Sequence, residues 1–301
     1  MSAPDPSLRS SLPKFNRSVS LLTWGLNEEA LVREFLDRAF TLLDSTVEDF
    51  EVIFVNDGST DCTAEILAAY AAKEPRLKVI TNEVNMNVGR SCRRAIAAAG
   101  KDFLLWQTVD WSYDIAHLRI FLGLLNHFDV IQGVRPVPIR LLSYIPVLRS
   151  LYRVRTRSDD LRKALVSLGN YYLLRILFGV PFHDFQNVTI YPRALIQSVE
   201  LTGDSSFLNP ECLLRTYERG ATFLEVPIPF IRRTQGQAKG TKLSSIMRSI
   251  RNIVKAWLKW GWRFRLHNRN ATRRRIYRVS EPFHLDEDVL RLVTPLFKEF
   301  R

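Results

Sequence analysis

Two aspartates and a serine follow a mostly apolar run and could together hold a metal ion. The run extends from Phe103 to Val109, and Asp110, Ser112 and Asp114 come directly after it. Because side chains alternate between the two faces of an extended chain, we expect these three to point to one side. Mg²⁺ and Mn²⁺ prefer such oxygen ligands and usually share them with substrate phosphates. The same spacing also fits a strand followed by a polar turn with solvated aspartates, so the motif alone leaves both interpretations open.

Further polar clusters follow the strands predicted earlier in the chain. Strands are predicted at residues 18–23, 50–55, 77–81 and 103–109, and helices at residues 28–43, 61–72 and 90–99. Strands that alternate with helices of this length form right-handed crossovers and a parallel sheet. Ligands bind such sheets beyond the carboxyl ends of the strands. Four polar clusters would meet there, at Asn27-Glu28, residues 56–61, residues 87–90 and Asp110-x-Ser112.

Two of these clusters carry groups that suit a nucleotide diphosphate. Asp57 could accept a hydrogen bond from a base or a ribose, or it could only form a turn before the next helix. Gly89 permits close backbone approach, and Arg90 could face a diphosphate or lie on a solvated helix face. The glycine-rich patterns of dinucleotide-binding and P-loop proteins do not occur, which weakens those two interpretations.

Composition restricts the class of protein and its compartment. With 301 residues, 46% hydrophobic and 25% charged, the chain can bury a substantial core in one large domain or two. Its three cysteines, an odd and sparse set, suit a reducing compartment. Residues 1–16 are rich in Ser and Pro and lack the apolar run of a signal peptide, so we expect a flexible tail. No window approaches the ~20 apolar residues of a membrane span.

The net charge of +12 is concentrated near the C-terminus. Lys242 to Arg278 contains twelve Lys or Arg and no Asp or Glu, which indicates an anionic partner, either a membrane surface or nucleic acid. From Ser245 to Trp260 apolar and basic residues repeat at helical spacing on opposed faces, as in a helix at a membrane interface. An amphipathic helix docked on the protein has the same pattern. We rank nucleic acid lower because no known binding motif appears.

The polar clusters, in this order and spacing, resemble the inverting GT-A glycosyltransferases of family 2. The shared motifs are Asn27-Glu28, Val55-Asn-Asp57-Gly-Ser-Thr-Asp61, Asn87-x-Gly89 and Val109-Asp110-x-Ser112. Later segments are similar to polyprenyl-phosphate sugar transferases of the dolichol-phosphate mannosyltransferase type, namely Gly133-Val-Arg135, Asp184-Phe-Gln186, Glu225-Val-Pro and Arg233-Thr-Gln-Gly236-Gln-Ala238-Lys239. The resemblance covers about residues 17 to 239 and is more specific for the fold than for the acceptor.

This resemblance implies an α/β protein with the Rossmann-like GT-A fold, in which helices flank a mostly parallel sheet. The expected organisation is a tail at residues 1–16, a GT-A domain at residues 17–240 and a basic amphipathic helical extension at residues 241–301, without transmembrane helices. The extension is expected to associate with a membrane.

The resemblance also implies roles for individual residues. A Mg²⁺ or Mn²⁺ ion is expected to bind Asp110, Ser112 and Asp114. The expected catalytic residues are Asp110 and the phosphate-contacting Arg135, Arg233 and Lys239. Donor contacts are expected from Trp24, Asn27, Glu28, Asp57, Gly89, Arg90 and Asp110. The sequence departs from the family at Trp24, where a Pro-x-Tyr-Asn motif is usual, at Ser112, which replaces an aspartate, and at Ala238, which replaces a serine.

The acceptor decides whether a general base is needed. A lipid phosphate is already largely ionised near pH 7, because the second pKa of a phosphate monoester is about 6. A hydroxyl acceptor would require a carboxylate, for which Asp204 and Glu211 are candidates. Asp184 and Gln186 could contact the donor sugar or only cap a turn.

The sequence therefore predicts an inverting, metal-dependent transfer of a sugar from a nucleotide diphosphosugar to a polyprenyl phosphate. The enzyme is expected in the cytoplasm, peripheral at the inner face of a membrane. The alternatives are the same chemistry on a saccharide, another lipid or a small-molecule hydroxyl, and, ranked lower, a non-catalytic sugar-nucleotide binder or a nucleic-acid-binding protein.

Overall fold

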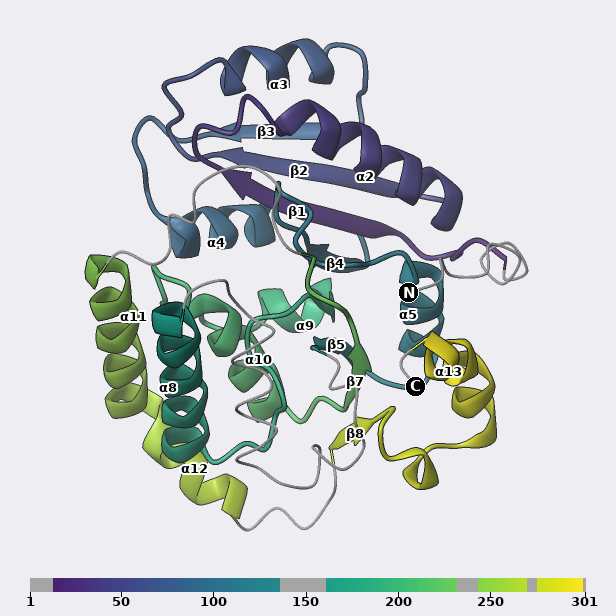
Figure 1. The fold of residues 1–301 in the computed structure, drawn as a ribbon, viewed down its shortest axis with the longest axis vertical. Coiled ribbons are helices and arrows are strands. Elements are labelled where there is room, and N and C mark those ends of the chain that lie inside the picture. The colour runs from purple at the N-terminus through teal and green to yellow at the C-terminus, as the bar shows by residue number, and fades with distance from the viewer. Residues whose placement is uncertain (1–12, 136–160, 232–242, 270–274, 300–301) are drawn as a thin grey trace.

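The computed structural model describes residues 13–135, 161–231, 243–269 and 275–299. These residues form an eight-stranded sheet in the order β3-β2-β1-β4-β6-β5-β7-β8, and Figure 1 shows helices on both of its faces. The strands of the N-terminal half are β1 (Val19–Gly25), β2 (Phe50–Asn56), β3 (Leu77–Thr81) and β4 (Phe103–Trp106).

The N-terminal half has the predicted alternation of strands and helices. Its four strands pair in parallel. The helices between them are α2 (Val32–Thr46), α3 (Thr63–Ala71) and α4 (Val88–Ala98). The main difference from the sequence prediction is that β4 ends at Trp106 rather than at Val109. Pairing stops there because the chain turns, as described below.

The C-terminal half of the sheet contains one reversed strand. β6 (Thr189–Pro192) lies antiparallel between β4 and β5 (Val130–Val134). β5, β7 (Phe223–Pro227) and β8 (Ile276–Arg278) then pair in parallel. The prediction of a mostly parallel sheet flanked by helices is therefore confirmed.

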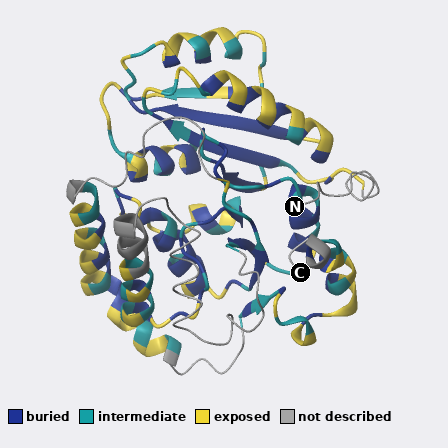
Figure 2. Cartoon of the chain, in the orientation of Figure 1, coloured by how far each residue is buried: buried dark blue, intermediate teal, exposed yellow. Residues whose placement is uncertain are grey.

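Each face of the sheet is covered by its own hydrophobic cluster. One cluster includes residues of α2, α3, α5 (Leu118–Gly123) and α13 (Glu287–Glu299). The other includes residues of α4, α8 (Leu161–Phe178), α9 (Arg193–Gln197), α10 (Leu208–Glu218), α11 (Leu243–Ala256) and α12 (Trp262–Arg269). All seven residues of β2 are buried, and Figure 2 shows the burial concentrated on the strands and on the inner sides of the helices.

The described C-terminal residues share this core. A π-helical segment, η3 (Trp257–Gly261), joins α11 to α12. Short 3₁₀ segments occur at η1 (Leu124–Asn126) and η4 (Pro282–His284). The segment predicted as a helical extension thus also contributes a strand, β8, to the main sheet, while the domain boundary at residue 240 stays a prediction. Among the described helices, none has the length and apolar character that crossing a membrane requires.

A buried ion pair fastens β8 to β7 and provides a test of this arrangement. Arg278 Nε donates to Glu225 Oε2 at 2.8 Å, and the two side chains are 12% and 1% exposed. We expect Arg278→Met to lower the free energy of unfolding by about 3 kcal/mol, because it leaves a carboxylate buried without this cation. Urea denaturation of the full chain measures the loss.

The matched control for Arg278→Met is Arg291→Met on the exposed face of α13, whose side chain is 77% exposed. This change should cost under about 0.5 kcal/mol. The double variant Arg278→Met with Glu225→Gln should regain part of the stability, and equal losses in the single and double variants would contradict the account.

Candidate functional site

The loop after β1 is tied to the loop after β2. The Asn27 amide donates to Ser59 Oγ at 2.9 Å, and Asn27 Oδ1 accepts from the Thr60 amide at 2.8 Å. The Glu28 amide donates to Thr63 Oγ1 at 2.9 Å. Asn27 and Glu28 therefore lie at the carboxyl edge of the sheet, as predicted, and the Asn27 side chain holds the two loops together.

Asp57 organises the neighbouring loop between β3 and α4. Its side chain is buried, and Oδ1 accepts from Asn82 Nδ2 at 2.7 Å and from the Met86 amide at 2.8 Å. Asn82 Nδ2 also contacts Ser91 Oγ, on α4, at 3.0 Å. The network fixes the Asp57 carboxylate at the strand ends, where its predicted contact with a base or ribose stays a prediction.

Backbone strain is concentrated at the same edge. Among the described residues other than glycine, positive φ occurs at Asn27 (53°), Asn87 (71°) and Trp111 (51°). These three follow β1, β3 and β4. Such conformations cost about 1–3 kcal/mol each and gather at functional sites, where the surrounding structure enforces them. A tryptophan is especially unsuited to positive φ, so the turn after β4 is held by its surroundings.

The chain turns at Asp110 and Trp111 before it pairs again at residues 112–114. The Trp111 amide donates to Thr108 O at 2.9 Å, and the left-handed backbone of Trp111 reverses the chain. The Trp111 ring is buried against Phe35, with ring centroids 5.6 Å apart. The prediction that the strand stays extended into the motif is therefore wrong, because β4 ends at Trp106 and the chain turns at Trp111. The side chains of Asp110 and Ser112 still lie together.

The two carboxylates of this turn have different partners. The Ser112 hydroxyl donates to Asp110 Oδ1 at 2.6 Å, and the Ser112 amide lies 3.2 Å from the same oxygen. Burial lowers the pKa of the Arg38 guanidinium, and the charge of Asp114 acts in the opposite direction. Arg38 lies over the Trp111 ring at 4.5 Å. Ser112 thus positions Asp110, while its role as a metal ligand stays a prediction.

The oxygen atoms of the turn fit a metal that is shared with a substrate. Within the described parts of the chain, no group of three or more His, Cys, Asp or Glu side chains could hold a metal ion. Mg²⁺ commonly takes one or two protein carboxylates and completes its coordination with substrate phosphates and water. Asp110 and Asp114 are of the number and kind of ligand that such a shared ion takes, and metal binding by them stays a prediction.

A short backbone ladder joins this turn to the chain after β7. The Ile231 amide donates to Ser112 O at 2.8 Å, and the Asp114 amide donates to Pro229 O at 3.0 Å. Tyr113 and Phe230 form an antiparallel bridge between these bonds. The chain then continues toward the predicted phosphate contacts Arg233 and Lys239, which lie outside the described residues.

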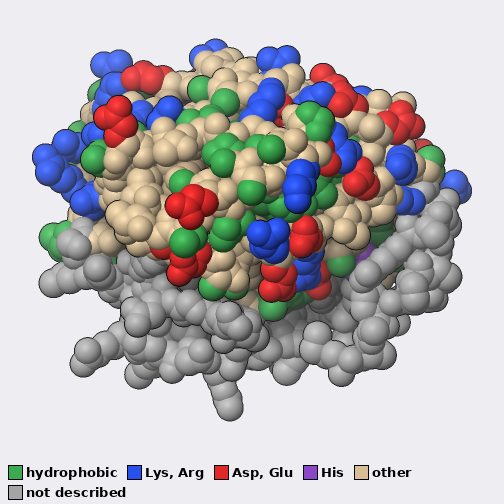
Figure 3. All heavy atoms as spheres, turned by 90° about the horizontal axis from the view of Figure 1, so that it is seen from above, with side chains coloured by type: hydrophobic (Ala, Val, Ile, Leu, Met, Phe, Trp, Pro, Cys, Tyr) green, Lys and Arg blue, Asp and Glu red, His purple; other side chains and the backbone are tan. Residues whose placement is uncertain are grey.

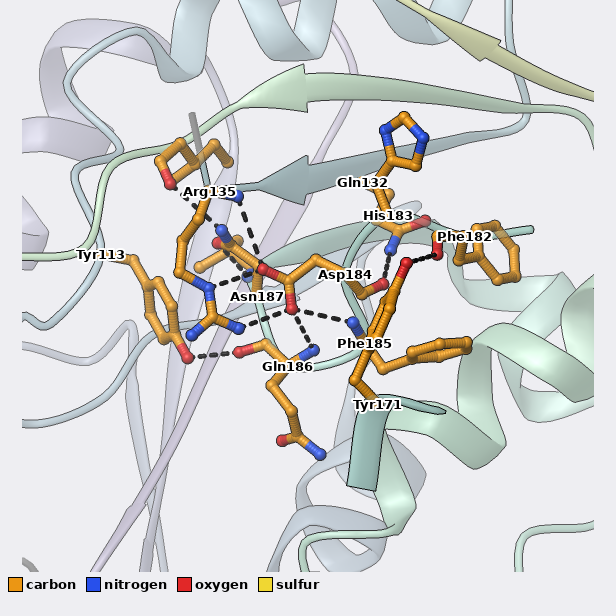
Figure 4. Close-up of polar contacts among 12 residues, drawn as sticks. Tyr113, Gln132, Arg135, Tyr171, Phe182, His183, Asp184, Phe185, Gln186 and Asn187 are labelled. Atoms are coloured by element: carbon orange, nitrogen blue, oxygen red, sulfur yellow. Dashed lines mark hydrogen bonds and ion pairs between the residues drawn. The ribbon is translucent and has the colours of Figure 1, made fainter. Parts of the chain in front are cut away.

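Arg135 is held by a buried carboxylate. Its Nε and Nη2 each donate to Asp184 at 2.6 Å, and the side chains are 13% and 3% exposed. Burial alone would lower the pKa of Arg135, but the Asp184 charge raises it above the usual value. Figure 4 shows Asp184 between Arg135 and the amides of Phe185 and Gln186, which it also caps. Of the two roles predicted for Asp184, the structure shows the cap.

Tyr113 connects this ion pair with the Asp110 turn, a link that the sequence analysis missed. Its hydroxyl donates to Gln186 O, and its own carbonyl accepts from Gln107 Nε2 at 2.7 Å. Gln186 Nε2 in turn donates to Ser206 O at 3.1 Å. Residues so far apart in sequence carry no local signal that would have paired them.

Glu211 holds a loop that packs on Gly89. The fully buried Glu211 carboxylate accepts from the amides of Thr202 and Gly203 at 3.0 and 2.7 Å and from Thr202 Oγ1 at 2.9 Å. A Cβ at Gly89 would lie 2.4 Å from the carbonyl carbon of Asp204. The close approach at Gly89 is therefore made by this loop.

The other predicted donor contacts lie around the same edge. Trp24 is half-buried and packs on Trp106, with ring centroids 6.3 Å apart, and Arg90 is exposed in the first turn of α4. A pocket of about 300 Å³ lies between the Thr202–Asp204 loop and α11. Its lining contains none of the predicted donor contacts, so it is separate from the strand-end cluster.

The buried Glu211 generates a prediction about pH. Burial raises its pKa above the usual 4.5, although the loop hydrogen bonds oppose the shift. The folded protein therefore keeps this proton at pH values where the unfolded chain has lost it, and the contribution to stability falls as the pH rises from 4.5 through the folded pKa. Denaturant unfolding from about pH 4 to pH 7 should show Glu211→Gln gaining stability relative to wild type.

The exposed Glu83 provides the control for this titration. Glu83→Gln should change the unfolding free energy by under about 0.5 kcal/mol, as surface substitutions usually do. A flat difference for Glu211→Gln, or one of the opposite slope, would show that burial does not dominate at Glu211.

Comparison with known proteins identifies the family. Residues 25–172 match the model of glycosyl transferase family 2. The dolichyl-phosphate hexose transferase of Haloferax volcanii is 27% identical over 238 residues, 77% of this chain and 91% of that protein. EpsH of Bacillus subtilis is 36% identical over 95 residues, and that match spans only 26% of EpsH.

Solved structures show the same fold. Glucosyl-3-phosphoglycerate synthase from Mycobacterium tuberculosis, in complex with Mn²⁺, UDP and glucosyl-3-phosphoglycerate, matches with a TM-score of 0.53 at 18% identity. The match covers 80% of each chain. The family match, the sheet order and this likeness agree: the chain contains a glycosyltransferase family 2 domain, matched over residues 25–172, and has the GT-A fold.

Proposed function

We propose that the chain transfers a sugar, with inversion, from a nucleotide diphosphosugar to a polyprenyl phosphate. The observation that carries the proposal is the Asp110 turn. It follows β4 at the same sheet edge as the Asp57 network and is hydrogen-bonded to residues 229–231, which precede Arg233 in sequence. A lipid phosphate acceptor is supported by two relatives, the hexose transferase from Haloferax volcanii and a dolichyl-phosphate β-glucosyltransferase of Trichomonas vaginalis, 28% identical over 118 residues.

The donor is proposed to lie along the ends of β1, β2 and β3. Asp57 would accept from the base or the ribose, because the hydrogen bonds from Asn82 and Met86 hold its carboxylate in place. Trp24 would border the base, and Asn27 and Glu28 would hold the loops that surround the nucleotide. The exposed Arg90 would face the diphosphate.

Asp110 and Asp114 would hold Mg²⁺ or Mn²⁺ together with the diphosphate. When bound, the ion supplies Lewis-acid neutralisation of the leaving diphosphate. The Ser112 hydroxyl fixes one oxygen of Asp110, and the buried Trp111 ring anchors the turn. A carboxylate fixed before the substrate arrives loses little conformational freedom on binding.

The acceptor phosphate is proposed to meet cations from Arg135, Arg233 and Lys239. Asp184 holds the Arg135 guanidinium in one orientation through two hydrogen bonds, and the pKa shift keeps it charged at every physiological pH. Since the attacking phosphate oxygen is already ionised near neutral pH, no strong general base is required. The polyprenyl chain would remain in the membrane, with the enzyme peripheral at its cytoplasmic face.

Asp110→Asn tests the proposed reaction directly. We expect at least a 100-fold loss of sugar transfer to detergent-solubilised polyprenyl phosphate, since charge neutralisation at the leaving group is lost. Ser112→Ala should instead raise the Mn²⁺ concentration needed for half-maximal rate by about tenfold, as removal of a supporting hydrogen bond does. Both are measured by radiolabelled transfer across a Mn²⁺ series.

Glu48→Gln is the control and should leave transfer unchanged, because this exposed carboxylate precedes β2 and so lies at the opposite, amino-terminal edge of the sheet. Turnover with hydroxyl acceptors only would refute the lipid phosphate acceptor. Full transfer by Asp110→Asn would refute the assigned role of the turn.

A further inference from the structure

α11, η3 and α12 form one helical rod with three different stripes. The buried stripe consists of Ser249, Ile253, Ala256, Trp260 and Phe264. An exposed apolar stripe consists of Met247, Ile250, Val254, Leu258, Trp262 and Leu266, with side chains between 39% and 61% exposed. An exposed basic stripe consists of Arg248, Arg251, Lys255, Lys259 and Arg263. The buried stripe packs on the domain, while the apolar stripe and most of the basic stripe face outward.

The π-helical segment keeps the apolar stripe on one side of the rod. In an α-helix, with 3.6 residues per turn, each step of four residues drifts about 40° around the axis. The stripe takes four such steps from Ile250 to Leu266. The wider turn of η3, in which hydrogen bonds span five residues, absorbs part of the drift. Side chains before and after η3 therefore stay exposed together, over about 29 Å of rod.

The neighbours of the rod place its two exposed stripes. Trp257 Nε1 donates to Leu177 O at 3.2 Å, which puts α8 beside the apolar stripe. α8 itself carries two exposed apolar side chains, Tyr172 and Ile176. On the other flank, Lys259 pairs with Glu200 at 2.7 Å and Asn252 donates to Asp204 at 2.6 Å. The basic stripe therefore borders the loop that packs on Gly89, next to the proposed donor site.

The rod differs in its charge pattern from the opposite end of the molecule. Figure 3, which views the molecule from the end that carries β3 and α3, shows cations and carboxylates interspersed. From Lys242 to Arg278, in contrast, the sequence contains no Asp or Glu. An apolar band beside a purely cationic band matches a bilayer, which presents an apolar interior under a layer of anionic headgroups.

We propose that the exposed stripes of the rod, together with the exposed side chains of α8, dock the protein on an anionic lipid bilayer. The rod would lie in the plane of the interface, with the apolar stripe among the acyl chains and the basic stripe among the headgroups. A second copy fits less well, because the two basic stripes would face each other across the interface.

The docked orientation would bring the catalytic edge to the lipid. In Figure 1 the arrowheads of β1 and β2 point toward the side of the molecule where α8 and α11 lie. A phosphate at the membrane surface would then face the strand ends. This delivery role rests on the proposed transfer to a lipid phosphate, whereas bilayer binding itself does not.

Vesicle flotation of the full chain tests the docking surface. Wild type should bind phosphatidylcholine vesicles that contain 30% phosphatidylserine and bind pure phosphatidylcholine far more weakly. Leu258→Ser with Trp262→Ser should weaken binding at least tenfold, since two apolar side chains stay in water. Arg251→Glu with Lys255→Glu should weaken it at least 25-fold, about fivefold for each cation removed. Thermal melts within a few degrees of wild type show that these exposed changes leave the fold intact.

Matched variants elsewhere separate the stripes from general surface effects. Phe283→Ser and Lys73→Glu change an exposed aromatic and an exposed cation away from the rod, and should leave vesicle binding unchanged. The proposal would be overturned if wild type does not bind anionic vesicles, or if both stripe variants bind them as tightly as wild type does. A third outcome would also overturn it: wild type self-associates, and the Leu258→Ser, Trp262→Ser variant loses self-association but still binds vesicles.

A turnover assay separates this proposal from the proposed function. With short-chain polyprenyl phosphate in detergent, the stripe variants should keep wild-type kcat, because docking is not needed there. Stripe-dependent vesicle binding without transfer to any polyprenyl phosphate would refute the proposed function and support the docking surface.

Discussion

Two backbone hydrogen bonds between the Asp110 turn and the chain after β7 hold the two halves of this molecule in register at the site. Through Ser112 O and the Asp114 amide, the turn is paired with residues 229–231 as if it were a short additional strand. The ladder explains how Trp111 can remain at positive φ. The backbone of Trp111 could relax only if the hydrogen bonds of Ser112 and Asp114 to residues 229–231 broke first. The proposed metal ligands and the approach to Arg233 therefore move as one unit.

Polar networks at the strand ends supply the rest of the rigidity. Asp57, Asp184 and Glu211 are buried carboxylates, and each accepts backbone amides from a loop. A buried carboxylate is costly unless such donors surround it. If one of these loops moved, its carboxylate would stay buried but lose its amide donors. This cost favours a single arrangement of each loop.

The sequence predicted the parts of the fold that follow from periodicity. Alternating strands and helices placed Asn27, Asp57 and Asp110 on one edge, because parallel strands share the edge at which they end. It failed at the Asp110 turn, where a tryptophan takes a conformation that its residue type disfavours. It also had no means to pair Arg135 with Asp184, because the contact forms only when β5 and the chain before β6 meet. In the rod, Ile253 and Val254 are both apolar, yet only Ile253 is buried. The sequence prediction assigned both residues to one apolar face and so could not tell which of them would be buried.

The rod lies in the connection between two strands that neighbour each other in parallel, β7 and β8. It is thus a crossover within the sheet and not a detachable tail. A protein truncated before the rod would lose β8 as well, and β7 would become an uncovered edge with unpaired amide and carbonyl groups. Such an edge recruits strands from other molecules. Removing the rod to improve solubility would therefore promote aggregation instead.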